Sequence, residues 1–267
     1  MLPRATRAAR VFLVTSGALV AGVALAGCGA SAEDAAPEKR TFAISGRQLT
    51  VDTDNSAVEL VQGADEGRQI KVTRWFDGWA LGGTAGVSWA MDGDTLKLRL
   101  KCKGLSVGCE AKHRIEVPRG VAVTVEDGNG AVTARGFDAD LKLVSDNGAL
   151  SVRDAKGRLE LRTSNGDVTA DGIGSRQVSA KADNGGIRLA FAGVPDRVTT
   201  ENGNGPTRIA LPGTAYRVET GTGNGRTKVD VPTDRSGAHA VSAHSRNGDI
   251  TVITASTTAS TKASTTG

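Results

Sequence analysis

The sequence predicts an all-β chain, folded as a single-chain β-solenoid of 18–20-residue coils with an irregular N-terminal cap. Asn-Gly recurs seven times in the second half, at steps of 18, 18, 19, 20, 20 and 23 residues. Such a period is typical of stacked repeat proteins. Between the pairs, short segments alternate apolar and polar residues, and no stretch keeps a helical period. The pairs are Asn129-Gly130, Asn147-Gly148, Asn165-Gly166, Asn184-Gly185, Asn204-Gly205, Asn224-Gly225 and Asn247-Gly248.

The first 27 residues have the pattern of a lipoprotein signal peptide. Three arginines precede an uncharged apolar run at 11–26, and the run ends in Leu25-Ala26-Gly27-Cys28, which resembles a bacterial lipobox. The alternative is an uncleaved anchor helix, but the run is shorter than the roughly 20 apolar residues that a membrane-spanning helix needs. We therefore expect cleavage before Cys28 and attachment of lipid, including palmitate, to that residue.

Composition divides the remainder of the chain. Residues 28–40 form the lipidated cysteine and a polar, flexible tether. Residues 41–253 form the β-solenoid domain, with an irregular part at 41–118 and regular Asn-Gly repeats at 119–253. Residues 254–267 are rich in Ser and Thr and are expected to be disordered.

The irregular part contains five short segments with strand character, at 49–53, 57–61, 70–74, 96–100 and 114–117. Asp54-Asn55-Ser56 lies between the first two and looks like a degenerate first copy of the repeat turn.

One repeat shows how a coil is built. Strands are expected at 141–145 and 149–153, with turns at 146–148 and 154–157. One set of side chains would face inward: Leu141, Leu143, Leu150, Val152, Leu159, Leu161 and Val168. The other set would face outward: Lys142, Ser151, Arg153, Glu160, Arg162 and Thr169.

Two architectures fit this pattern. Asn-Gly between alternating runs is a strong hairpin signal, so an antiparallel meander is one. A β-solenoid is the other, and it buries the apolar face inside its own coil without a second layer. Stacked coils would also bring equivalent asparagines about 4.8 Å apart, where they can form a hydrogen-bonded ladder. This difference favours the solenoid.

Charge gives little support for a nucleic-acid partner. The full chain has a net charge of +4, and removal of three arginines with residues 1–27 leaves 30 basic and 29 acidic residues, or +1. A nucleic-acid-binding protein would need a clustered basic face.

Cys102 and Cys109 are the two cysteines left after Cys28. They flank a turn-like stretch, and an even pair in an exported protein predicts a disulfide. A free thiol pair and a metal site are the alternatives, but no His or third Cys has suitable ligand spacing.

Motifs with catalytic or metal-binding character lack their usual context. Gly104-Leu105-Ser106-Val107-Gly108 matches G-x-S-x-G, which requires a strand-to-helix elbow in an α/β fold. Acids near the turns could bind calcium, but they keep no common register. The histidines are scattered, so no catalytic residue, metal site or cofactor is expected. They are His113, His239 and His244.

Four of the aromatic residues lie within 15 residues of each other: Trp75, Phe76, Trp79 and Trp89. This segment could be a hydrophobic plug at the end of the solenoid, since terminal coils must be covered. Alternatively, it could be a recognition patch for a glycan or a protein. Loss of folding on substitution of Trp75 and Trp79 would indicate the plug.

These features resemble the DUF4097 family of candidate adhesins. The seven Asn-Gly turns with their flanking strands carry the resemblance, as does His113-Arg114-Ile115-Glu116-Val117-Pro118-Arg119-Gly120, which is similar to the family's lead-in strand. The resemblance covers about 45–253. It implies a β-solenoid with an extracytoplasmic location and offers no catalytic residues.

Together these observations predict a non-catalytic lipoprotein, anchored by Cys28 to the extracytoplasmic face of a bacterial cell membrane. It would act as an adhesin or surface interaction scaffold for an unidentified glycan or protein, in an unknown oligomeric state. An envelope sensor or assembly partner acting through residues 75–89 is the alternative. A polysaccharide-active β-helix enzyme would need a cluster of acids and bases on one face, which the sequence does not show.

Overall fold

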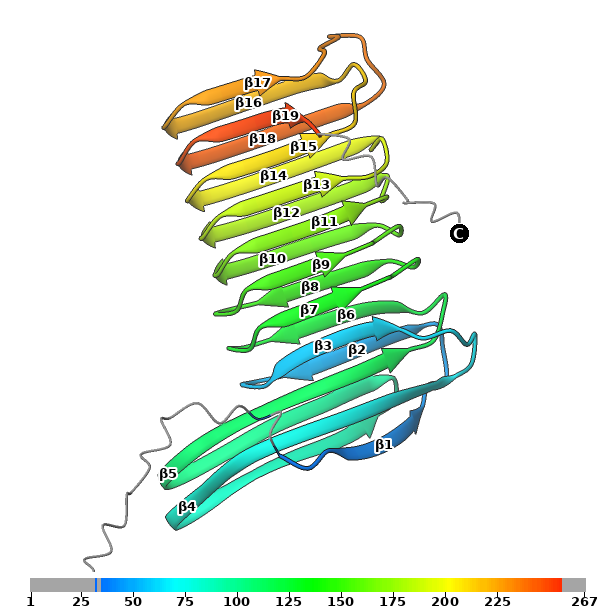
Figure 1. Cartoon of the computed structure of the whole chain (residues 1–267), viewed down its shortest axis with the longest axis vertical. Helices are drawn as coiled ribbons and strands as arrows, with labels where there is room; N and C mark the ends of the chain where they lie inside the picture. Colours follow the sequence, from blue (N-terminus) through cyan, green and yellow to red (C-terminus); the bar gives the residue numbers. More distant parts are fainter. Residues whose placement is uncertain (1–31, 33–34, 256–267) are drawn as a thin grey trace, which may run out of the picture.

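The computed structural model describes residues 32 and 35–255 and shows one 19-stranded sheet wound into an elongated rod (Figure 1). The predicted all-β solenoid is confirmed. The signal peptide, Cys28 and the tail from residue 256 onward lie outside the described residues. Within the described part, no helix has the length and apolar character needed to span a membrane.

The strands fall into an N-terminal group and a repeat group. The N-terminal group is β1 (Glu38–Ala43), β2 (Gln48–Thr53), β3 (Ala57–Gln62), β4 (Gln69–Asp92) and β5 (Thr95–Val117). The repeat group is β6 (Ala122–Asp127), β7 (Val132–Arg135), β8 (Leu141–Ser145), β9 (Leu150–Arg153), β10 (Leu159–Asn165), β11 (Val168–Ile173), β12 (Gln177–Asn184), β13 (Ile187–Phe191), β14 (Arg197–Asn204), β15 (Thr207–Leu211), β16 (Arg217–Asn224), β17 (Thr227–Asp230), β18 (Ala240–Asn247) and β19 (Ile250–Thr254).

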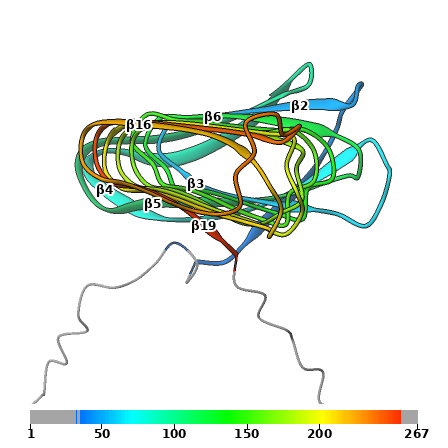
Figure 2. The ribbon, with the colours of Figure 1, turned by 90° about the horizontal axis from the view of Figure 1, so that it is seen from above.

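Each repeat makes one flattened coil with two strands, one on each broad face, as the end-on view shows (Figure 2). The Asn-Gly turn joins the two strands on one edge, and a longer return turn leads to the next coil on the other edge. Equivalent strands pair in parallel, for example Leu141 with Leu159 and Leu150 with Val168. The turns therefore connect faces of a coil and do not form hairpins.

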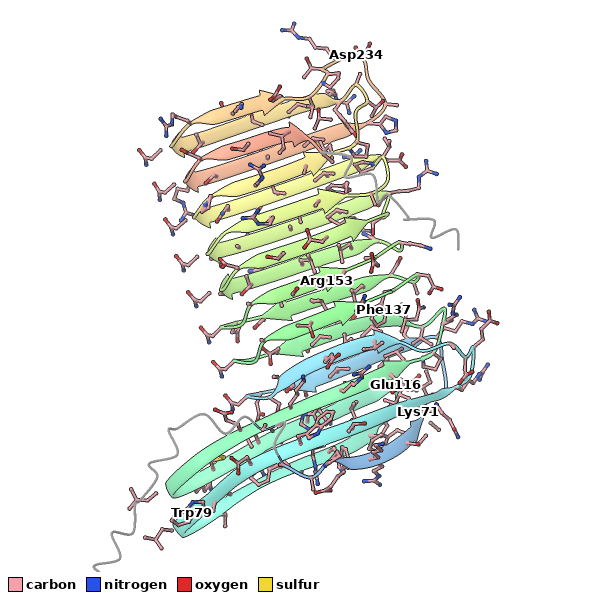
Figure 3. The ribbon with its side chains drawn as sticks, in the orientation of Figure 1. Lys71, Trp79, Glu116, Phe137, Arg153 and Asp234 are labelled. Carbon is pink, nitrogen blue, oxygen red and sulfur yellow. A yellow bond between two sulfur atoms is a disulfide. The ribbon has the colours of Figure 1, made fainter. Side chains whose placement is uncertain are left out.

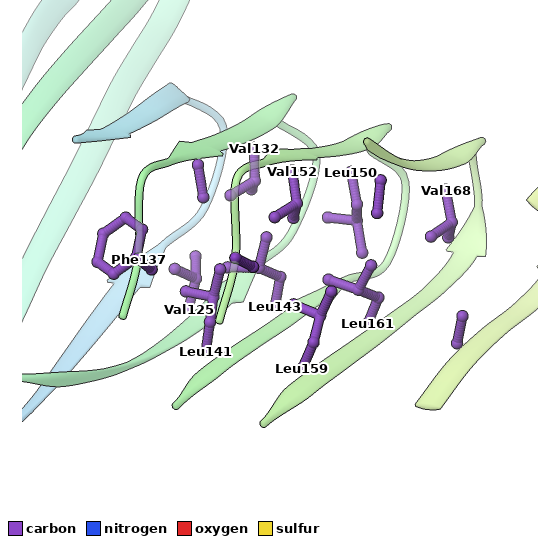
Figure 4. Close-up of a cluster of buried hydrophobic side chains, with 14 of the residues drawn as sticks. Val125, Val132, Phe137, Leu141, Leu143, Leu150, Val152, Leu159, Leu161 and Val168 are labelled. Atoms are coloured by element: carbon purple, nitrogen blue, oxygen red, sulfur yellow. The ribbon is translucent and has the colours of Figure 1, made fainter. Parts of the chain in front are cut away.

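Alternation along the strands builds the core. All seven side chains predicted to face inward are buried, and Figure 4 shows several of them meeting between the two faces. Phe137 and Tyr216 fill the interior near the return edge. Burial of aliphatic side chains is the main favourable contribution to folding, so this stripe holds the coils together.

The coils do not stack in sequence order at the C-terminal end. β18 and β19 lie between β14–β15 and β16–β17, pairing with both neighbours in parallel. The coil β16–β17 is therefore the end of the rod, although 37 residues follow Asp230 in the chain.

The N-terminal end shows a similar displacement. β2 pairs with both β5 and β6, and β3 pairs with both β5 and β7. The coil β2–β3 is thus inserted between the long β5 and the first regular repeat.

The region expected to be irregular contains the two longest strands. The short strands predicted at 70–74, 96–100 and 114–117 are parts of β4 and β5, which pair in antiparallel fashion as a ribbon. One arm of β5 pairs with β2 and the other with β3, so the ribbon bends around the end of the rod. β1 pairs with β4 along one outer edge.

Candidate functional site

A ladder of eight asparagines runs along one edge of the rod. From the second asparagine onward, each side-chain Nδ2 donates to the Oδ1 of the asparagine before it in the stack, over seven hydrogen bonds of 2.7–3.0 Å. The ladder begins at Asn55, so the degenerate turn belongs to the stack. Its spatial order is Asn55, Asn129, Asn147, Asn165, Asn184, Asn204, Asn247 and Asn224, which includes the displaced coil.

The glycine that follows each asparagine also stacks. A Cβ added at any of the seven would lie 1.8–2.3 Å from a carbonyl oxygen of the adjacent coil. Real Cβ atoms do not approach backbone oxygen so closely, so the packing of neighbouring coils demands glycine here. The members are Gly130, Gly148, Gly166, Gly185, Gly205, Gly225 and Gly248.

A column of inward-facing, mainly polar residues lies two positions before each asparagine. Thr163 Oγ1 donates to Gly148 O at 2.9 Å, and Asn202 Nδ2 donates to Gly185 O at 3.0 Å. These groups satisfy turn carbonyls inside the rod. Sequence reasoning missed this column, although its fixed offset from each asparagine is a readable signal. It comprises Thr53, Asp127, Ser145, Thr163, Ala182, Asn202, Ser245 and Thr222.

Asp127 is the one acid in that column. Its Oδ2 accepts from the Gly130 amide at 2.8 Å and from Ser145 Oγ at 2.9 Å. Burial raises the pKa of the Asp127 carboxyl to about 6, an effect that these two hydrogen bonds reduce.

The aromatic segment divides into buried and exposed residues. Trp89 lies inside the bent ribbon, where its ring meets Phe42 edge-on at 6.2 Å and Arg74 Cζ lies 4.2 Å from its centroid. Trp75 and Phe76 are half-buried, whereas Trp79 is 56% exposed. Trp89 therefore covers the end of the core, as the plug interpretation requires, and Trp79 does not.

His113 is fully buried beside Trp89, with ring centroids 6.5 Å apart. Neither ring nitrogen has a hydrogen-bond partner in the described part of the chain. Burial, reinforced by the positive charge of Arg74, lowers the pKa of His113 to about 4. The residue is thus a neutral component of the cap.

The ribbon bends where β4 passes through Gly82-Gly83 and β5 through Gly104. A disulfide joins Cys102 and Cys109 across this bend, with their Cα atoms 6.5 Å apart. Trp79, Leu81 and Leu105 lie at the projecting tip, where Figure 3 shows Trp79 beyond the regular coils. Leu81 and Leu105 were not singled out from the sequence, because only the bend brings them beside Trp79.

Ser106 of the G-x-S-x-G match lies at this exposed tip, inside a strand, with no helix following it. The required strand-to-helix elbow is therefore missing. His239 and His244 also lie apart from it: His239 Nδ1 is 2.9 Å from Pro195 O near the return edge, and His244 is in β18. Within residues 32 and 35–255, no three His, Cys, Asp or Glu side chains form a metal-binding group.

Two lysines on one broad face of the rod form ion pairs with acids on the neighbouring strand. Lys142 and Lys181 form ion pairs with Glu160 at 3.0 Å and Glu201 at 2.9 Å. Those pairs lie on the face formed by β8, β10, β12 and β14.

On the opposite face, Arg188 of β13 and Arg208 of β15 are direct neighbours in register, and both are exposed. No ion pair to either arginine occurs among the described side chains. They line an open groove of about 450 Å³, together with Thr169 and Thr251.

Comparison with known proteins places these features in context. A family model described as Toastrack DUF4097 matches residues 117–253. No curated protein matches the chain. Among solved structures, a candidate adhesin from Bacteroides fragilis NCTC 9343 is similar over 82% of this chain and 97% of that chain, with 13% identity and a TM-score of 0.51. A candidate cell adhesion protein from Clostridium sporogenes ATCC 15579 is similar over 82% of this chain and 100% of that chain, with 10% identity and a TM-score of 0.36.

Proposed function

The chain belongs to the Toastrack DUF4097 family, and from this premise we propose that it is a non-catalytic lipoprotein that serves as an adhesin-like interaction scaffold. It is anchored through lipid on Cys28 to the extracytoplasmic face of a bacterial membrane. The rod presents its broad faces to a surface glycan or protein.

The observation that carries this proposal is the arginine pair on one face. Arg188 and Arg208 are held side by side by the parallel register of β13 and β15, and their groove contains the hydroxyl groups of Thr169 and Thr251. Neighbouring strands in a sheet lie about 4.8 Å apart, which brings two positive charges close together. Guanidinium groups bind carboxylates and phosphates through paired hydrogen bonds. The site therefore fits a partner with repeated negative charges.

The groove also contains acids, but they have partners of their own. Asp167 Oδ1 accepts from the Gly186 amide at 2.7 Å, and Asp249 accepts from the Arg226 amide at 2.9 Å. They do not form ion pairs with the two arginines, which supports an external partner for these cations.

The test is retention of the lipid-free chain, residues 28–267 with Cys28→Ser, on isolated cell envelope, purified wall glycan and a panel of extracellular proteins. This chain contains every residue that the structure describes. Saturable retention is expected, and Arg188→Ala with Arg208→Ala should weaken it about tenfold, as loss of charge-assisted hydrogen bonds implies. Added salt should also weaken it.

The matched control is Lys142→Ala with Lys181→Ala, which removes the same charge from the opposite face. Equal losses in both variants would argue against a specific groove and would indicate a general charge effect. No retention by the unaltered lipid-free chain would reject the scaffold proposal.

Lipid anchoring has a separate test. Mass spectrometry of the N-terminal peptide should show an acylated Cys28, and Cys28→Ser should abolish this acylation. An unmodified N-terminus on the membrane-bound protein would contradict the anchor.

The second candidate function is an envelope sensor or assembly partner acting through residues 75–89. The observation in its favour is the exposed tip around Trp79. Retention by one envelope protein that is lost with Trp79→Ala, but kept with Arg188→Ala and Arg208→Ala, would support it.

A further inference from the structure

The tip of the bent ribbon carries a concentrated apolar surface. The exposed fractions are 56% for Trp79, 63% for Leu81 and 76% for Leu105. These are three of the five large exposed apolar side chains among the described residues, and the other two are Val194 and Val229. Exposed apolar groups gathered at one site commonly mark an interaction surface.

Pairing in the ribbon places the three side chains on one face. Leu81 and Leu105 are direct cross-strand partners. Trp79 precedes Leu81 by two residues on the same strand, and side chains two residues apart point to the same face of a strand. Gly104, with a φ of 88°, and the Cys102–Cys109 disulfide hold the bend. The apolar tip formed by Trp79, Leu81 and Leu105, called the wedge below, is therefore held in a fixed shape.

Charges of both signs flank the wedge, with the basic residues on one arm of the ribbon and the acidic residues on the other. Lys101 and Lys103 are exposed in β5 and have no ion pair within the described residues. Asp77 and Glu110 lie opposite each other on the arm that carries Trp79 and Leu81, so a basic contact would involve only the lysine arm. A tryptophan with aliphatic neighbours and flanking lysines is suited to the boundary between lipid headgroups and acyl chains.

The start of the fold lies near the same tip. Glu38, the first residue of β1, forms an ion pair with Arg74, and Arg74 precedes Trp79 by five residues in β4, or about 17 Å of strand. Ala32 lines a groove with Cys109 and Glu110. Cys28 is four residues before Ala32 and can lie no more than about 14 Å from it. A lipid on Cys28 would hold this end of the rod at the bilayer.

We propose that the tip formed by Trp79, Leu81 and Leu105 inserts into the headgroup region of an anionic lipid bilayer, with Lys101 and Lys103 contacting lipid phosphates. The inference rests on the proposed lipid anchor at Cys28 and adds a second, protein-borne contact. Two contacts at one end would orient the rod, leaving β16–β17 as the end distant from the membrane.

Vesicle co-sedimentation of the lipid-free chain, residues 28–267 with Cys28→Ser, tests the tip without the anchor. Vesicles of phosphatidylglycerol and phosphatidylethanolamine should bind this chain. Trp79→Ser, Leu81→Ser and Leu105→Ser together should weaken binding at least about tenfold, because burial of even one large side chain is worth that factor. The matched control, Val194→Ser with Val229→Ser, should bind as the unaltered chain does.

Tryptophan fluorescence provides a readout that does not depend on sedimentation. Vesicles should shift the emission of the lipid-free chain to the blue, and the shift should be lost with Trp79→Phe. Folding of each variant is checked by circular dichroism, and a misfolded triple variant would be replaced by Leu105→Ser alone.

Absence of vesicle binding by a folded, lipid-free chain would overturn the inference, whatever the state of Cys28. Vesicle binding that the triple variant retains would overturn the inference as well. It would also be overturned if an envelope protein captured the lipid-free chain and vesicles did not bind it. Acylation of Cys28 and retention on envelope material are measured separately, so failure of the tip and failure of the proposed function are distinguishable.

Discussion

An added Cβ at Gly148 would lie 1.8 Å from the carbonyl oxygen of Gly130 in the neighbouring coil. We expect Gly148→Ala to lower the free energy of unfolding by about 3 kcal/mol, because the two coils would have to move apart. Gly193→Ala is the matched control, since its nearest atom is 3.5 Å away. Chemical denaturation of both variants measures the difference. Similar stability in the two would show that close stacking does not determine these glycines.

Asp127 should make the chain less stable at neutral than at mildly acidic pH. Its pKa in the folded state, about 6, lies above the ordinary value of 3.8, so the folded state binds more protons between these values. Stability contributed by this group therefore rises as pH falls from 6 toward 4. Asp127→Asn should be more stable than the unaltered chain by about 2 kcal/mol at pH 8, with the gain shrinking at pH 4.5. Denaturation midpoints at both pH values provide the measurement.

His113 acts in the opposite direction. Its pKa falls from 6.5 to about 4 on folding, so the unfolded state binds more protons between these values and stability decreases as pH falls through them. In Asp127→Asn, the opposing contribution of Asp127 is absent, so the free energy of unfolding should decline steeply below pH 6. In His113→Leu, stability should instead rise on acidification. The same slope in both variants would contradict the assignment.

The residue-level pattern was largely predictable from sequence. Alternation identified which of Leu141 and Lys142 faces inward, because a strand has a period of two. The roles of Asp127 and His113 were not predictable, since burial of a polar side chain depends on neighbours that are distant in sequence. Asp127, for example, contacts Ser145 only because two coils stack in register.

At the scale of elements, the bent ribbon depends on the Cys102–Cys109 disulfide to hold its two arms together. We expect Cys102→Ser with Cys109→Ser to loosen the tip while the regular coils remain folded, because the cross-link closes a short loop at one end. Limited proteolysis should show new cleavage between residues 103 and 108. Unchanged resistance to protease would mean that the ribbon pairing alone holds the bend.

The ribbon was also the element that sequence reasoning described least well. Only short strands within β4 and β5 were predicted, and glycines lie between them at 78, 82, 83 and 86. In the structure they let a long ribbon curve while its cross-strand pairing continues on both sides of the bend. A glycine can end a strand or bend it, and the packing under the strand decides between the two. Here the ribbon lies over the core that Trp89 covers.

At the scale of the whole molecule, the displaced coil makes the C-terminal end depend on the last strands. Among the described strands, β16 pairs in parallel only with β18, and β17 only with β19. A chain ending at Ser236 should therefore lose amide protection throughout β16 and β17, while β6–β13 stay protected because repeats are stabilised by their neighbours. Hydrogen exchange with mass spectrometry measures both regions. Protection of β16 in the shortened chain would show direct pairing with β14.

The order of the coils could not be predicted from repeat patterns. Every coil carries the same repeat pattern, so the sequence alone does not show whether β14 pairs with β16 or with β18. The one available signal was the long final step of 23 residues. That extra length, in the connection between β17 and β18, allows the chain to return by one level.

This arrangement separates the end of the polypeptide from the end of the rod. During synthesis, β16 and β17 emerge before β18 and β19, the strands with which they pair. The C-terminal coils therefore cannot complete their pairing until the last strands have been made. A premature stop codon within the last strands would leave two sets of unpaired backbone groups, on β14–β15 and on β16–β17, each able to recruit a foreign strand. Complete translation is therefore a condition for pairing both β14–β15 and the inner edge of β16–β17. An exopeptidase that trims the finished chain as far as β19, in contrast, reaches a strand that pairs with β15 on one side and with β17 on the other.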